Sequence, residues 1–126
     1  MHLARAGRMP ALILSSPALR ATETAEVVAA ALVYPAGDIA IDERLYLAEP
    51  REILEVVGEI HPTVDELLVV GHNPGLSQVA ARSVSDPRII LTPGSLADIS
   101  FDTSSWGDIA SGGGTLTSLV TPDDLR

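Results

Sequence analysis

The stretch Leu67–Leu76 constrains the fold more than any other part of the sequence. Four apolar residues at 67–70 have the density of a short strand, and His72 follows almost at once. The turn residues 73–75 then lead into a new helix. Ligands bind at the carboxyl ends of the strands in an open α/β sheet, so this order places an imidazole in a crevice at the sheet edge. The alternative is a purely structural histidine that caps or hydrogen-bonds the turn.

A second stretch has the same order of elements. The apolar run 12–14 predicts a buried strand, and the pattern at 18–31 predicts a helix with Ser16 as its N-cap. Arg20 falls in the first turn of that helix, so its guanidinium, the backbone N–H groups and the positive end of the helix dipole would face one small volume. That volume suits a phosphate. A capping serine and a surface arginine explain this segment equally well when it is taken alone.

The remaining segments continue the alternation of strands and helices. No repeat, low-complexity segment or domain boundary interrupts them, so residues 1–126 are expected to form one domain. The apolar strands at 12–14 and 67–70 have the composition of strands that are buried on both faces. The other expected elements are the end of a helix at 1–7, an edge strand at 39–41, a helix from about Glu49 to Ile60, a helix from Pro74 to about Val84, and a hairpin of strands at 96–101 and 115–120.

Composition excludes several classes of function. The chain has no cysteine, and its three histidines lie far apart in sequence, so we expect no disulfide, metal site or cofactor. The formal net charge is -9, which argues against a nucleic-acid partner because phosphate backbones need a basic surface. The longest apolar stretches fall well short of the roughly 20 residues that span a bilayer, and no signal-like segment opens the printed sequence. We therefore expect a cytoplasmic protein with no membrane partner.

Two motifs in this order resemble the histidine phosphatase superfamily. The first is 14–26, which reads Leu-Ser-Ser-Pro-Ala-Leu-Arg-Ala-Thr-Glu-Thr-Ala-Glu, and the second, about fifty residues later, is 70–76, which reads Val-Gly-His-Asn-Pro-Gly-Leu. Within the superfamily the sequence is similar to the small SixA-type phosphohistidine phosphatases. Segments 92–97 and 119–122 resemble the last strands of that group. The likeness covers essentially the whole chain.

The resemblance implies an α/β fold of the phosphoglycerate mutase-like kind. This fold has three layers, with a mixed, mostly parallel sheet flanked by helices and an active site at the carboxyl ends of the strands. Arg20 matches the arginine that grips the phosphoryl oxygens, and His72 matches the second catalytic histidine, beside the transferred group. Ser16 and Asn73 adjoin these two residues, and we expect them to support phosphate binding.

One part of the resemblance is missing. The family's nucleophile is a histidine in an Arg-His-Gly or Arg-His-Ala motif at the end of the first, central strand, and the sequence contains no such motif. Neither His2, in the helix remnant, nor His61, after a different helix, can replace it. At ordinary element lengths roughly 35 to 40 residues are absent. We therefore expect Met1 to be an internal methionine of a longer protein, and the chain as printed to be inactive.

Several hypotheses of function remain open. The first is a phosphohistidine phosphatase in which an imidazole attacks phosphorus while Arg20 and His72 stabilise the charge, without a metal. A phosphomonoester also needs an acid to protonate its leaving group, and the resemblance implies a glutamate after the segment that corresponds to 45–47. Here those positions carry no carboxylate, and Glu49 comes slightly late. A phosphohistidine-bearing protein, such as a phosphorelay His domain, is therefore favoured over a small phosphate ester.

The second hypothesis is an inactive remnant that binds phosphate or a phosphoprotein. An unrelated α/β domain with chance motifs is the third. The sequence carries no information on the oligomeric state.

Overall fold

A computed structural model describes residues 10–92 and 96–120 of the chain. The chain divides into two compact units. The first contains the residues up to Leu47 together with Thr63–His72, and the second contains Ala48–Pro62 together with the residues from Asn73 onward. Each unit is described by itself, and the expectation of one domain over 1–126 stays a prediction. The expected helix end at 1–7 lies outside the described residues.

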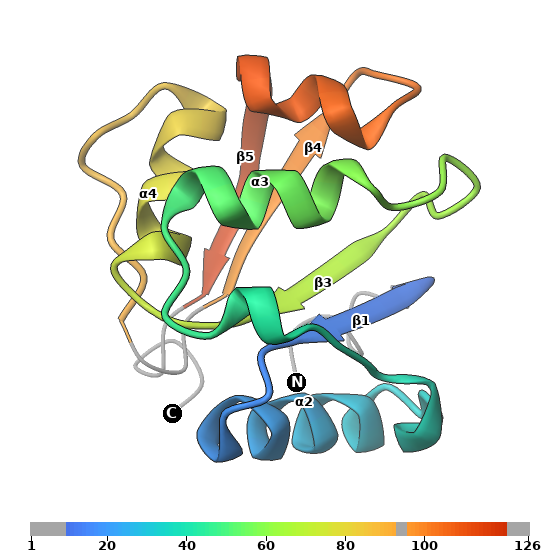
Figure 1. Cartoon of the computed structure of the whole chain (residues 1–126). Coiled ribbons are helices and arrows are strands. Elements are labelled where there is room, and N and C mark those ends of the chain that lie inside the picture. The colour runs from blue at the N-terminus through green and yellow to red at the C-terminus, as the bar shows by residue number, and fades with distance from the viewer. Residues whose placement is uncertain (1–9, 93–95, 121–126) are drawn as a thin grey trace. The chain divides into compact units, whose positions relative to one another are not determined.

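The first unit is a parallel sheet with a helix packed on it. Its strands have the order β2-β1-β3, and all neighbours are parallel, as the two strand–turn–helix stretches predict. Figure 1 shows α2 lying along β1, and the two elements are in contact. The elements are β1 (Leu12–Ser15), α2 (Leu19–Ala31), a short 3₁₀ helix (Ala36–Asp38), β2 (Ala40–Ile41), a second 3₁₀ helix (Glu43–Leu45) and β3 (Leu67–Val70).

Small side chains bring α2 close to the sheet. Its buried residues are Ala21, Ala25 and Ala29, which recur every four positions and so share one face of the helix. Two of these alanines form a core cluster with Ile13 of β1, and Leu68 and Val70 of β3 pack against that cluster. The helix therefore covers one face of the strands whose carboxyl ends carry the candidate site.

β3 is one of the two edge strands of this sheet. It pairs with β1 from Leu12↔Leu67 to Ser15↔Val70, and no described strand pairs with its other edge. All four of its residues are only half-buried, whereas Ile13 and Leu14 of the central strand β1 are buried. The expectation of burial on both faces is thus confirmed for 13–14 and wrong for Leu12 and for 67–70, which are half-buried. The residues 67–70 are more exposed because an edge strand has a neighbour on one side only.

The second unit combines two helices with an antiparallel hairpin. β4 (Leu96–Phe101) and β5 (Gly114–Val120) pair antiparallel, as expected, and Figure 1 shows their arrows pointing in opposite directions. α4 (Gly75–Val84) contacts both strands, and α3 (Pro50–Gly58) contacts α4 and the 3₁₀ helix Trp106–Ser111. The described strands therefore form two sheets, one parallel and one antiparallel, with helices packed on them. This α/β class is the one that the sequence predicts.

Close backbone packing holds the helices of the second unit together. A Cβ added at Gly75 would overlap the carbonyl group of Ala48 and lie 3.1 Å from Cδ1 of Ile53, so only glycine fits there. Glu49 and Glu52 form a capping box at the start of α3, in which the Glu52 carboxylate accepts a hydrogen bond from the Glu49 N–H group at 3.0 Å. No helix among the described residues is long and apolar enough to cross a membrane.

Candidate functional site

The carboxyl ends of the three parallel strands meet at one edge of the first unit. The backbone ladder continues one step beyond the strands, because the Ser16 N–H group donates to the Val70 carbonyl at 2.9 Å and the Asp42 N–H group donates to the Ser15 carbonyl at 3.0 Å. These bonds fix the residues that follow each strand. Ser16 follows β1, Asp42 follows β2, and His72 comes two residues after β3. This is the edge at which ligands bind in open α/β sheets.

Ser16 and His72 are joined directly across this edge. The Oγ atom of Ser16 lies 2.8 Å from Nε2 of His72, although the residues are 56 positions apart in sequence. Ser16 is fully buried, and its Oγ also accepts a hydrogen bond from the Ala18 N–H group at 3.3 Å. The helix α2 has Ala18 as its N-cap and no side-chain cap, so the expectation that Ser16 is the N-cap is wrong. Its hydroxyl is instead shared between the turn and the imidazole.

Tyr46 is a neighbour of His72 that no pattern in the sequence indicates. The two rings are 5.6 Å apart between centroids and make an angle of 76°, an edge-to-face contact. Tyr46 itself is 57% exposed, so this contact lies at the surface. A tyrosine in the irregular segment after β2 carries no pattern of its own in the sequence, and only the fold brings it to the histidine.

Arg20 lies in the first turn of α2 and is exposed. Within the described part of the chain its guanidinium has no hydrogen-bond or ion-pair partner, and the first turn of α2 has no acidic residue. Arg20 is therefore available to an anion near the positive end of the helix dipole. The structure shows no hydrogen bond between Arg20 and His72, and their convergence on one ligand stays a prediction.

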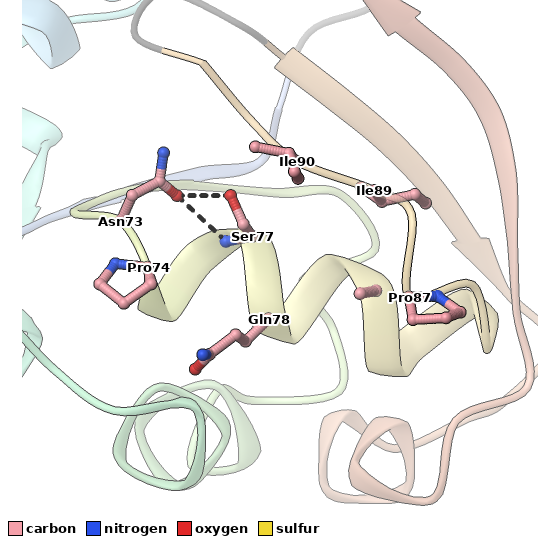
Figure 2. Close-up of a pocket in the computed structure, with 8 residues that line it drawn as sticks. Asn73, Pro74, Ser77, Gln78, Pro87, Ile89 and Ile90 are labelled. Atoms are coloured by element: carbon pink, nitrogen blue, oxygen red, sulfur yellow. Dashed lines mark hydrogen bonds between the residues drawn. The ribbon is translucent and has the colours of Figure 1, made fainter.

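Asn73 is held by contacts within the second unit. Its Oδ1 accepts hydrogen bonds from the hydroxyl of Ser77 at 2.6 Å and from the Ser77 N–H group at 3.2 Å, as Figure 2 shows, and its Nδ2 donates to the carbonyl of Leu91. The Ser77 hydroxyl also accepts from the Leu91 N–H group at 2.8 Å. These bonds tie the segment after α4 to the first turn of that helix. They give Asn73 a sufficient structural role, and its expected part in phosphate binding stays untested.

A pocket of about 340 Å³ lies beside α4 in the second unit (Figure 2). None of its lining residues carries a charge, so the pocket lacks the cationic groups that a phosphoryl ligand needs. It is lined by Asn73, Pro74, Ser77, Gln78, Ala81, Pro87, Ile89 and Ile90.

The one carboxylate that directly follows a strand of the first unit is already paired. Asp42 accepts hydrogen bonds from the backbone N–H, Nε and Nη2 of Arg44 at 2.9, 3.1 and 2.8 Å. The side-chain hydrogen bond from Arg44 lowers the pKa of Asp42 below its ordinary value, so this carboxyl group stays ionised at neutral pH. It cannot act as a proton donor. No group of three or more His, Cys, Asp or Glu side chains suited to a metal ion occurs among the described residues.

Comparison with solved structures identifies proteins that share this fold. No protein-family model and no curated protein sequence matches the chain. A structure assigned as the phosphohistidine phosphatase SixA from Nakamurella multipartitia matches with a TM-score of 0.73 at 23% identity, over 96% of this chain and 76% of that chain. A structure of the protein histidine phosphatase SixA in complex with tungstate matches with a TM-score of 0.72 at 23% identity, over 99% of this chain and 77% of that chain. The chain therefore has the fold of the SixA structures.

Proposed function

We propose that this chain provides the phosphoryl-binding half of a phosphatase that acts on phosphohistidine in a protein. The observation that carries the proposal is the hydrogen bond between Ser16 and His72 at the carboxyl edge of a parallel sheet. Shortly after Ser16, α2 begins with Arg20 in its first turn, and the Arg20 guanidinium has no partner within 10–92 and 96–120. A similar structure was solved with tungstate, a tetrahedral oxyanion of the same shape as phosphate, which supports an anion site in this fold.

The two residues have distinct parts in the proposed chemistry. In the transition state the transferred phosphoryl group carries its negative charge on three equatorial oxygens, and catalysis consists mainly of positioning these oxygens and stabilising that charge. Arg20 supplies a planar fork of N–H donors for two oxygens, and His72 supplies a ring nitrogen beside them. Neither residue supplies the covalent step, which needs an imidazole aligned with the bond that breaks.

The proposed phosphatase also needs a histidine nucleophile, and the printed sequence does not supply one. It contains no Arg-His motif, and its other histidine within the described residues, His61, is exposed between α3 and β3. We propose that hydrolysis needs a further strand that ends in Arg-His. Without that strand, the chain binds phosphoryl groups and does not turn them over.

We favour protein phosphohistidine over a small phosphate ester as the substrate because both candidate acids, Asp42 and Glu49, are already engaged in other contacts. An ester needs a carboxylic acid to protonate its alkoxide leaving group, whereas imidazole is a far better leaving group. Asp42 is held ionised by Arg44, and Glu49 belongs to the capping box at the start of α3. Asp42 therefore cannot donate that proton, and the Glu49 side chain is already engaged in the turn that starts α3. An inactive phosphate-binding protein remains the second candidate, because it needs the same contacts and no nucleophile.

Two proteins assayed side by side test the proposal. One is the chain as printed, and the other carries an added N-terminal strand that ends in Arg-His-Gly. We expect tungstate binding by both proteins, and metal-independent release of phosphate from a phosphohistidine protein only by the extended one. Replacing the added histidine by alanine should abolish the release. An extended protein that is folded and binds tungstate without any turnover would favour the inactive phosphate-binding protein.

A further inference from the structure

We infer that Ser16 fixes the tautomer of His72, so that the neutral imidazole carries its proton on Nδ1. Ser16 is thus a positioning residue, and Nδ1–H is the group that His72 presents to a ligand. The inference starts from the contact between Ser16 Oγ and His72 Nε2 at 2.8 Å, which by itself is compatible with either direction of donation.

The hydroxyl proton of Ser16 decides the direction. A serine hydroxyl has one proton to donate and two lone pairs that accept, and one lone pair takes the N–H group of Ala18. The described residues offer the proton a single acceptor, His72 Nε2, and Ser16 is 0% exposed, so solvent cannot serve instead. If Nε2–H donated to Oγ, the hydroxyl proton would be buried without a partner, which carries a large penalty.

The other ring nitrogen is free to act. Within the described residues Nδ1 of His72 forms no hydrogen bond, and the side chain is half-exposed, so this nitrogen is open to a ligand. In the Nδ1–H tautomer the lone pair of Nε2 is occupied by Ser16, and Nδ1 has no lone pair to offer. The neutral ring is therefore a hydrogen-bond donor and not a nucleophile. In the proposed phosphatase, on which this last step rests, Nδ1–H donates to a phosphoryl oxygen.

Nitrogen-15 NMR of the whole chain measures the tautomer without any ligand. The chain has three histidines, so a long-range proton–nitrogen spectrum at a pH where the rings are neutral is simple to assign, with His2→Gln and His61→Gln variants removing the other two signals. We expect the Nδ1–H form of His72 to exceed the Nε2–H form by about tenfold or more, from the penalty on an unpaired buried hydroxyl.

Three variants separate this role from general packing. Ser16→Ala should shift His72 toward a mixture of tautomers, and Ser16→Thr, which keeps the hydroxyl, should retain the Nδ1–H form. Ser15→Ala is the matched control, because Ser15 is equally buried but its hydroxyl donates to the Ser16 carbonyl and does not touch the histidine. This control should leave the tautomer unchanged.

The inference is overturned if neutral His72 in the unmodified chain carries its proton on Nε2, or if a folded Ser16→Ala variant keeps the Nδ1–H form. The unmodified chain and the threonine variant decide the question even if the alanine variant fails to fold. Adding tungstate tests the proposed function separately. We expect the Nδ1–H signal of His72 to move, and a signal that does not move would contradict the phosphoryl site while leaving the tautomer result intact.

Discussion

Replacing Arg20 with alanine should weaken oxyanion binding more than the loss of one surface charge can explain. The guanidinium is exposed in the first turn of α2 and has no partner among the described residues, so an anion at the helix N-terminus would be its first strong partner. Removing it deletes a charge-assisted, two-point contact and leaves the anion with the helix dipole and His72.

The size of the effect follows from the exposure of Arg20. A hydrogen bond to a charged group contributes about 1.5–3 kcal/mol, which corresponds to about 10- to 150-fold in the dissociation constant. Solvent screens an exposed guanidinium, so we expect the lower part of that range, about 10- to 30-fold. Arg20→Lys keeps the charge but loses the planar fork, and should fall between the alanine variant and the unmodified chain.

Isothermal titration with tungstate at fixed ionic strength measures this effect, and Arg88→Ala provides the control. Arg88 also belongs to a surface, but its guanidinium is paired with Asp86 at 3.0 Å in the second unit. Its removal lowers the net charge by the same amount as Arg20→Ala and should change the dissociation constant by less than about twofold. Equal losses in both variants would show that net charge alone governs binding, and the assignment of Arg20 would be wrong.

Three further predictions concern stability. Asn73→Ala should lower the free energy of unfolding by about 1 kcal/mol, because it removes the hydrogen bonds that anchor the segment after α4, and an unchanged free energy would contradict that anchoring role. Tungstate titration of the same variant tests the expected part of Asn73 in phosphate binding. Gly75→Ala should destabilise the chain by about 1–3 kcal/mol in urea unfolding, since the new Cβ overlaps a backbone carbonyl. Gly37→Ala is the control, because its new Cβ meets no atom within 4 Å and the variant should be nearly as stable as the unmodified chain. The side-chain hydrogen bond from Arg44 lowers the pKa of Asp42 in the folded state, so the stabilisation by this pair is fully present above the unfolded value of about 3.8 and is lost as the pH falls through the lower folded value. Arg44→Ala should therefore cost more stability at pH 6 than at an acidic pH where the folded Asp42 is protonated, and an equal cost at both would refute the pairing.

Local signals in the sequence were enough for most elements of the fold. The helix from about Glu49 is predicted from apolar residues that recur at helical spacing, and in the structure α3 begins at Pro50, where Glu49 and Glu52 form a capping box that was not predicted. The hairpin of β4 and β5 is predicted from two apolar runs with no helix between them. Both depend on residues that are near one another in the chain.

The features that could not be predicted depend on tertiary contacts. Ser16 has the sequence context of an N-cap, but α2 begins only at Leu19 with Ala18 as its N-cap, and the Ser16 hydroxyl contacts a residue 56 positions away. Tyr46 reaches His72 only because β2 and β3 flank the same central strand. The half-burial of 67–70 likewise depends on which strands pair, since the composition of an apolar strand does not reveal how many neighbours it has.

A crystal structure of the chain with tungstate tests the phosphoryl site most directly. We predict one oxyanion at the carboxyl edge of β2-β1-β3, within hydrogen-bonding distance of the Arg20 guanidinium and of Nδ1 of His72, with Ser16 still bonded to Nε2. An oxyanion bound elsewhere, with Arg20 and His72 directed to opposite faces of the first unit, would contradict it.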